Sequence, residues 1–169
     1  EKDGLWAMLL WLNILAVRKQ SVAQIMDDHW VKFGRNYYSR YDYEAVPSDA
    51  ANAMVARLRG SLDGLAGQDR AGLTITAADE FSYLDPVDGS LSAGQGLRIW
   101  FADGYRAVIR LSGTGTEGAT IRVYLERSVD VPSGDIADTA GALAPLVAAV
   151  LSVTRLPEMT GRDAPDVIT

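Results

Sequence analysis

The residues with the clearest capacity for chemistry lie between two arginines, Arg110 and Arg122. The segment between them is rich in glycines and hydroxyls, at Ser112, Gly113, Thr114, Gly115, Thr116, Gly118 and Thr120. Glycines let the backbone approach a ligand closely, and successive backbone N–H groups can form a concave site for an anion. Hydroxyls add neutral donors, and a planar guanidinium matches two phosphate oxygens at once. This combination predicts a phosphate-binding loop.

Two well-known phosphate motifs fit this segment only in part. Gly113, Gly115 and Gly118 satisfy the pattern G-x-G-x-x-G, but that dinucleotide fingerprint opens a helix. Here the β-branched, alternating residues 119–125 predict a strand instead. The P-loop glycine spacing is also present, but Ala119 stands where that motif needs its lysine. A glycine-rich hairpin turn without a ligand is the structural alternative.

The elements around this segment predict an antiparallel sheet. Alternating and β-branched runs indicate strands at 35–44, 73–84 (broken near 77–79), 96–101, 105–111 and 120–126. Asp103-Gly104 is expected to join two of these strands in a tight hairpin. The remaining segments are predicted to be irregular: a loop at 64–72, a turn at 85–90 and a tail at 161–169.

Two helices are predicted to complete this domain. One begins after Pro47 and runs to about Leu62. The residues expected on or near its buried face are Ala53, Val55, Leu58 and Leu62. The other covers 136–156, where Pro145 predicts either a kink or a start near Leu143, because proline disrupts a helix interior. The order β-α-β-β-β-α predicts an α+β fold, an antiparallel β-sheet with two helices packed on one face.

An apolar segment at 5–17 precedes this domain. It is too short to span a bilayer, and acidic residues stand where a signal peptide would carry positive charge. We therefore expect an N-terminal helix that is normally buried in a larger body. A second helix at 22–33 is expected to follow, because Ser21 and Gln24 form a capping box at its start.

Composition excludes several classes of function. The 169 residues carry a net charge of −6, which argues against binding to nucleic acid or to an anionic membrane. Cysteine is absent, so no disulfide or thiolate metal site is encoded and a cytoplasmic location is expected. His29 is the single histidine and is interpreted as a packed or surface residue. The aspartates Asp85, Asp88 and Asp103 are interpreted as turn residues rather than metal ligands.

The chain resembles the α-D-phosphohexomutases, specifically their phosphoglucomutase branch. The segment 110–122, R-L-S-G-T-G-T-E-G-A-T-I-R, is similar to the phosphate-binding loop of that family. Other segments agree in order, at 1–4, 34–44, 85–90, 95–98 and 160–169. The resemblance covers essentially the whole chain but only the C-terminal third of such an enzyme. We therefore expect a fragment that is truncated at its front.

The resemblance implies a division into two parts. Residues 1–33 would be the C-terminal helices of a third domain with its linker, and residues 34–169 the fourth, phosphate-binding domain. The fold of that fourth domain is grouped with the TATA-box-binding-protein-like folds, a label that describes shape and implies no DNA binding.

The family interconverts glucose 1-phosphate and glucose 6-phosphate through glucose 1,6-bisphosphate. The resemblance implies a phosphoserine loop in the first domain, Mg²⁺ in the second and a sugar loop in the third, while the fourth grips the phosphate that is not transferred. No phosphoserine motif, D-x-D-x-D run or sugar loop is found in this sequence. Mg²⁺ and glucose 1,6-bisphosphate are thus expected in the complete enzyme, with neither bound by this chain alone, which should be inactive.

The resemblance also assigns roles to single residues. The substrate phosphate is expected to be bound by Arg110, Ser112, Gly113, Thr114, Thr116 and Arg122. Lys2 matches an active-site lysine that assists proton transfer or steadies charge, and a frayed terminal residue is the alternative. Glu117 departs from the family pattern, because it places a carboxylate beside a dianion.

Other functions remain open at this point. A phosphate-binding module without catalysis would account for the loop, and an interaction protein would account for the apolar N-terminal helix. A mutase for mannose or glucosamine phosphates is a further alternative, since the sugar loop is absent. The expected partners are a sugar phosphate, the missing N-terminal domains, and a second copy of the chain through the apolar helix.

Overall fold

The computed structural model of the chain describes residues 3–115, 118–130 and 137–169. The chain divides into two compact units. The smaller unit comprises Glu1–Arg35 and Val129–Ile136, and the larger unit comprises Asn36–Ser128 and Ala137–Thr169.

The smaller unit contains two helices, α1 (Gly4–Arg18) and α2 (Val22–Phe33). The Asp3 side chain caps α1 by accepting a hydrogen bond from the Trp6 amide at 2.9 Å. The predicted capping box is confirmed at α2, where Ser21 and Gln24 each accept a hydrogen bond from the other's backbone amide. No residue of α1 is buried, which agrees with a helix whose natural cover lies elsewhere.

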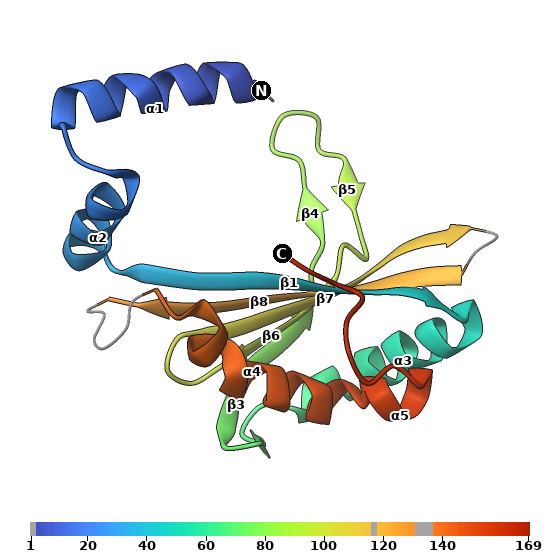
Figure 1. Cartoon of the computed structure of the whole chain (residues 1–169). Coiled ribbons are helices and arrows are strands. Elements are labelled where there is room, and N and C mark those ends of the chain that lie inside the picture. The colour runs from blue at the N-terminus through green and yellow to red at the C-terminus, as the bar shows by residue number, and fades with distance from the viewer. Residues whose placement is uncertain (1–2, 116–117, 131–136) are drawn as a thin grey trace. The chain divides into compact units, whose positions relative to one another are not determined.

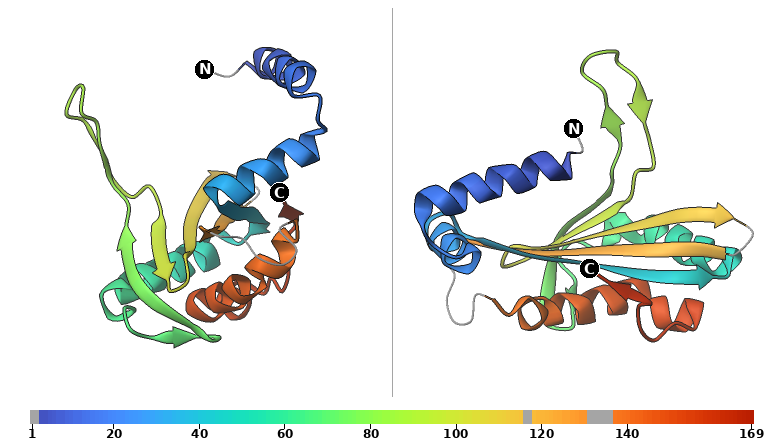
Figure 2. Two further views of the ribbon diagram at one scale, coloured as in Figure 1. Left: turned by 90° about the vertical axis from the view of Figure 1, so that its left-hand side faces the viewer. Right: turned by 45° about the horizontal axis from the view of Figure 1, so that its top comes forward.

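The larger unit is built on a seven-stranded sheet with the strand order β2-β3-β6-β7-β8-β1-β9 (Figure 1). Its strands are β1 (Arg35–Val46), β2 (Asp69–Arg70), β3 (Leu73–Glu80), β6 (Leu97–Phe101), β7 (Tyr105–Gly115), β8 (Gly118–Val129) and β9 (Val167–Ile168). The pairs β1/β9, β2/β3, β3/β6, β6/β7 and β7/β8 are antiparallel. A separate two-stranded hairpin, β4 (Tyr83–Leu84) and β5 (Leu91–Ser92), projects from the sheet (Figure 2).

Helices cover one face of this sheet (Figures 1 and 2). They are α3 (Ser48–Ser61) with the short 3₁₀ turn η1 (Leu62–Gly64), α4 (Thr139–Thr154) and α5 (Leu156–Thr160). Alternate strand residues and the inner helix faces form the core, with fully buried Ile75, Ile99, Ile109, Ile121, Leu125, Leu58, Leu143 and Leu146. Within the described part of the larger unit no helix packs on the opposite face, which we call the open face. The expected α+β fold is thereby confirmed.

The inner face of α3 differs from the expectation at one residue. Ala51, Met54, Val55 and Leu58 are buried, whereas Ala53 is exposed. Residues at spacings of three and four lie on one side of a helix, and Ala53 falls outside that series.

Of the two alternatives for the helix predicted at 136–156, the start near Leu143 is wrong. The helix begins at Thr139, where the Asp138 side chain accepts a hydrogen bond from the Gly141 amide at 2.8 Å. Pro145 therefore lies inside the helix, so the N–H that would bond to the Gly141 carbonyl is missing. The cap also explains Gly141, since a Cβ there would stand 2.1 Å from Asp138 Oδ2.

Three segments predicted to be irregular contain regular strand structure. β3 runs through 77–79 without a break, with a register shift between Ile75 and Ala77 instead. The predicted loop 64–72 contains β2, and the predicted tail 161–169 ends in β9. Thr169 and Arg40 exchange backbone hydrogen bonds of 2.7 and 3.0 Å, so a distant strand supplies the partner for the tail. Within the described ranges, no helix is long and apolar enough to cross a membrane.

Candidate functional site

The segment between Arg110 and Arg122 forms a β-hairpin rather than an open loop. Strands β7 and β8 pair through it, with Ser112 opposite Thr120 and Gly115 opposite Gly118. Because a strand follows the glycines, the dinucleotide fingerprint is excluded as predicted. The side chain of Thr114 is not described, and Thr116 and Glu117 lie outside the described residues.

Two glycines shape this hairpin for different reasons. Gly113 lies at the register shift between Ser112 and Thr114 and has φ +69°, a conformation that favours glycine. A Cβ on Gly113 would meet nothing within 4 Å, so the backbone conformation alone requires glycine there. At Gly118 space is also limiting, because a Cβ would lie 2.8 Å from the Val46 carbonyl oxygen of β1.

The hairpin places two arginines directly opposite each other. Arg110 and Arg122 are paired in register, and each alternates with buried core residues such as Ile109 and Ile121. Both side chains therefore lie on the open face. Like charges directly opposite in an antiparallel pair are destabilising. Arg110 is exposed and has no ion pair or hydrogen bond with the residues that the structure describes. No described carboxylate therefore balances its charge opposite Arg122.

A buried carboxylate lies beside this pair. Asp42 of β1 is only 4% exposed, and its Oδ2 is 3.7 Å from Arg122 Nε. Its Oδ1 is 2.9 Å from Arg40 Nε. Two arginines thus flank one carboxylate, and a third, Arg110, lies opposite Arg122, so the region carries an excess of positive charge on a chain with a net charge of −6. Such a region suits a dianion.

A glycine outside the hairpin makes room for Arg110. A Cβ on Gly96 would lie 2.9 Å from Arg110 Cγ, and Gly96 has φ +148°. A cavity of about 300 Å³ beside it is lined by both residues together with Arg59, Glu80 and Gln95. In the sequence, Gly96 is the expected start of a strand and part of the segment 95–98 that resembles the family, and neither signal links it to Arg110. The structure supplies the physical reason, since the Arg110 stem occupies the space that a side chain would need.

The three aspartates that could suggest a metal site shape turns. Asp85 Oδ1 accepts a hydrogen bond from the Val87 amide at 2.8 Å, and Asp88 Oδ1 accepts one from the Ser90 amide at 2.8 Å. The second bond lowers the pKa of Asp88. Asp103 has φ +58° in the β6–β7 turn with Gly104. Their predicted turn roles are confirmed, while Lys2 lies outside the described residues.

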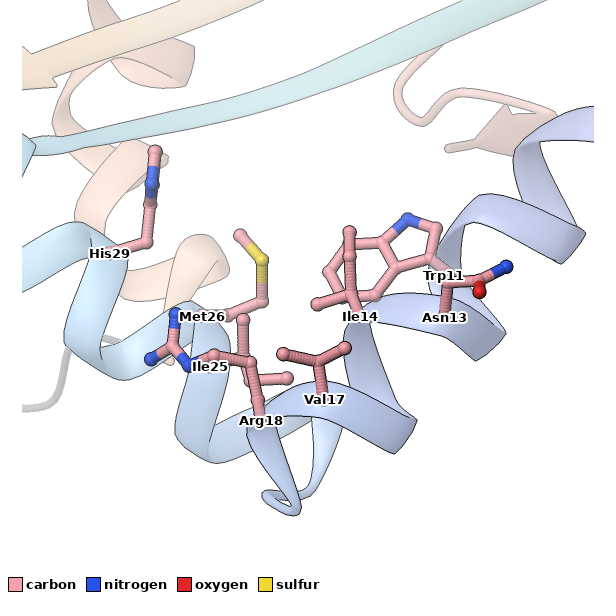
Figure 3. Close-up of a pocket in the computed structure, with 8 residues that line it drawn as sticks. All are labelled: Trp11, Asn13, Ile14, Val17, Arg18, Ile25, Met26 and His29. Carbon is pink, nitrogen blue, oxygen red and sulfur yellow. The ribbon is translucent and has the colours of Figure 1, made fainter.

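A large cavity of the smaller unit is apolar. It measures about 610 Å³ between α1 and α2, where Trp11, Ile14 and Val17 lie opposite Ile25 and Met26 (Figure 3). His29 at its rim is exposed and contacts the Phe33 ring at a centroid distance of 4.9 Å. Apolar walls of this kind suit packing against another protein surface rather than chemistry.

Known protein families account for both parts of the chain. The family model described as "Phosphoglucomutase-1, C-terminal domain" matches residues 35–166. The chain belongs to the phosphoglucomutase family. Residues 1–33 match a second phosphoglucomutase model, "Phosphoglucomutase/phosphomannomutase, alpha/beta/alpha domain III".

Individual phosphoglucomutases match the entire chain. The phosphoglucomutase of Rhizobium radiobacter is 52% identical over 169 residues, and Phosphoglucomutase-1 of Homo sapiens is 50% identical over 180 residues. The crystal structure of pp63/parafusin, a phosphoglucomutase from Paramecium, in its open form superposes with a TM-score of 0.84 at 44% identity, covering all of this chain and 30% of that one. The chain spans 31% of the length of the bacterial and human phosphoglucomutases.

Proposed function

We propose that this chain is the phosphate-gripping part of a phosphoglucomutase, which interconverts glucose 1-phosphate and glucose 6-phosphate through glucose 1,6-bisphosphate. The observation that carries the proposal is the placement of Arg110 directly opposite Arg122 on the open face. That arrangement is unfavourable without an anion and becomes favourable when both guanidinium groups bind one phosphate.

The other hairpin residues complete the grip in this proposal. The Ser112 hydroxyl and the amide of Gly113 donate to phosphate oxygens beside Arg110 and Arg122. Thr114 and Thr116 are expected from the sequence to add further hydroxyls, although the Thr114 side chain and Thr116 lie outside what the structure describes. The substrate must bind in two orientations so that either phosphate can react. A site that recognises only phosphate oxygens serves both orientations. We infer that these residues bind the phosphate group of the substrate and do not contact its sugar.

The transfer chemistry itself is assigned to the rest of the enzyme. Phosphoryl transfer needs a nucleophile, a metal ion and the substrate aligned together. No group of three or more His, Cys, Asp or Glu in the described ranges is arranged to hold a metal ion, so those residues do not fit a Mg²⁺ site. We place Mg²⁺ and the phosphoserine outside this chain, and Lys2 near them, where its charge steadies the transferred phosphoryl group.

Glucose specificity and location rest on the relatives. The matched relatives carry the name phosphoglucomutase, which favours glucose phosphates over mannose or glucosamine phosphates. A plant relative from Populus tremula is named cytoplasmic, whereas one from Solanum tuberosum is named chloroplastic. We infer a cytoplasmic enzyme, in keeping with a chain that has no cysteine.

The test is substitution of Arg122 in the full-length enzyme that carries this chain. A charge-assisted hydrogen bond is worth about 1.5–3 kcal/mol, so Arg122→Ala should raise the KM for glucose 1-phosphate roughly tenfold to a hundredfold. Arg122→Lys should recover only part of this loss, because an ammonium group cannot form the planar fork. The fold should survive, since Asp42 keeps its 2.9 Å contact with Arg40.

Arg106→Ala is the matched control. Arg106 lies on the same strand, β7, and on the same open face as Arg110. Unlike Arg110, it forms an ion pair with Glu126 of β8. Its removal should change KM by less than about twofold, as expected for an exposed ion pair. An unchanged KM in Arg122→Ala, with the protein folded, would refute the proposed grip.

A further inference from the structure

We propose that Asp42 is a positioning residue of the phosphate site, which holds the Arg122 guanidinium through Nε so that its terminal nitrogens face the ligand. This inference rests on the proposed phosphate grip and assigns the residue that orients it.

Asp42 is held firmly within the sheet. Its side chain is 5% exposed, although an ionised carboxylate is costly to bury unless it is paired. Its backbone carbonyl accepts a hydrogen bond from the Asp166 amide at 2.8 Å, and Asp42 pairs in register with Val167 of β9. Strand β1 thus lies between β8 and β9, so the carboxylate projects from a backbone fixed on both sides. A group held in this way can determine where its partners lie.

The contacts of Asp42 leave the arginine forks free. Its two oxygens approach Arg40 Nε at 2.9 Å and Arg122 Nε at 3.7 Å. Arg122 Nε is buried and has no hydrogen bond, so Asp42 is its charged neighbour. Within the described part of the chain, the terminal Nη atoms of Arg40 and Arg122 form no hydrogen bond. These atoms are the ones that bind phosphate oxygens in a bidentate manner.

Other arginines of the open face are bound differently. Asp79 accepts hydrogen bonds from both Nε and Nη2 of Arg98, at 2.7 and 2.6 Å. Glu126 accepts a hydrogen bond from Nη2 of Arg106. In both pairs the carboxylate occupies terminal nitrogens, so those arginines are less available to a ligand. Asp42 instead comes nearest to Nε of Arg40 and of Arg122 and accepts no hydrogen bond from their terminal nitrogens, so it can orient these arginines without occupying the atoms that would bind a ligand.

Electrostatics and positioning predict opposite effects of Asp42→Asn. The substitution removes one negative charge beside a bound dianion, so charge alone predicts tighter phosphate binding. If Asp42 orients Arg122, the loss of its charge frees the guanidinium to move and to be repelled by Arg40 and Arg110. Positioning therefore predicts weaker binding despite the more positive site. The sign of the change decides between the two roles.

The experiment uses the full-length enzyme and measures kcat, the KM for glucose 1-phosphate, competitive inhibition by inorganic phosphate, and thermal unfolding. We expect Asp42→Asn to raise both KM and the inhibition constant of phosphate about tenfold or more. Asp42→Glu keeps the charge but displaces it by one methylene, so it should fall between wild type and Asp42→Asn. Asp79→Asn, which removes a carboxylate from Arg98 on the same face, should leave both constants within about twofold.

Each outcome decides the inference. Unchanged or tighter phosphate binding in folded Asp42→Asn overturns it, because the carboxylate then only balances charge. If Asp42→Asn does not fold, Asp42→Glu decides: wild-type KM in the folded Glu variant overturns the inference, and a raised KM supports it. Arg122→Ala is measured in parallel. A raised KM in that variant together with unchanged Asp42 variants refutes only this inference, whereas an unchanged KM in Arg122→Ala refutes the proposed grip itself.

Discussion

Single residues outside the hairpin determine where its arginines lie. Gly96 is the clearest case, because the Arg110 side chain passes through the space where a Cβ would be, at 2.9 Å from Arg110 Cγ. Its φ of +148° belongs to a region that residues other than glycine rarely adopt. Space and backbone conformation thus both select glycine at this position.

We therefore expect Gly96→Ala to displace Arg110 and to weaken substrate binding. The strained backbone should cost about 1–3 kcal/mol of stability, and KM for glucose 1-phosphate should rise in the full-length enzyme. Gly94→Ala is the control: its φ of +65° also disfavours alanine, but its Cβ would come no closer than 3.7 Å to a neighbour, Glu80 Oε1. Equal KM values in the two variants would show that the crowding of Arg110 has no effect on binding.

Among the elements, β9 ties the end of the chain to β1 beside Asp42. The Asp166 carboxylate accepts a hydrogen bond from the Glu44 amide at 2.7 Å and pairs with Arg162. The Glu44 hydrogen bond, followed by the Arg162 interaction, lowers the pKa of Asp166. A carboxyl group whose pKa is lowered by folding stabilises the protein above its unfolded-state pKa. This contribution is lost as the pH falls through the folded-state pKa.

The stability difference between wild type and Asp166→Asn should therefore depend on pH. It should be present at pH 6 and shrink as the pH falls below about 4, the ordinary range of an aspartate. Denaturant unfolding of the 169-residue chain at several pH values measures this difference. Asp163→Asn serves as the control, since Asp163 is exposed and forms no hydrogen bond with described residues. A difference that stays constant down to pH 3 would contradict the assigned role of the carboxylate.

At the scale of the whole molecule, α1 presents an apolar surface without cover. Leu5 and Trp6 are 73% and 64% exposed, and Leu9 and Leu12 are also more than half exposed. Exposed apolar patches of this kind promote association. The match of residues 1–33 to a model of the preceding domain gives a reason, because the natural cover of this helix would belong to the rest of that domain.

The 169-residue chain should consequently self-associate, and deletion of residues 1–19 should reduce this association. Sedimentation velocity measures the change, and thermal unfolding followed by circular dichroism checks the remaining fold. We expect the larger unit to unfold cooperatively after the deletion, because α1 contributes no buried residue. Loss of cooperative unfolding would show instead that α1 is part of the folding core.

The isolated chain should not interconvert glucose phosphates. Phosphoryl transfer requires the nucleophile and the metal ion together with the phosphate grip, and we assign the first two to the part of the enzyme beyond this chain. A coupled assay with glucose 1-phosphate, glucose 1,6-bisphosphate and Mg²⁺ provides the measurement. The same assay on the full-length enzyme is the positive control, and turnover by the purified chain would contradict the division of labour proposed above.

The sequence alone determined the features that depend on neighbouring residues. The bounds of α2, its capping box and the Asp103-Gly104 turn follow from local hydrogen bonds, periodicity and backbone preference. The glycine-rich segment and its two arginines predict a phosphate site by residue type and spacing, and this assignment stays a prediction. These signals are readable because the interacting groups are close in the chain.

Tertiary structure decided what depends on contacts between distant segments. Asp42 lies 80 positions before Arg122, and β9 finds its partner in β1 near the other end of the chain. Gly96 meets Arg110 only because β6 and β7 pair in one register. A local pattern does not specify register between strands that are far apart in sequence, since many pairings satisfy the same alternation of buried and exposed residues. Packing of the complete sheet selects one of them, and with it the carboxylate that lies beside Arg122.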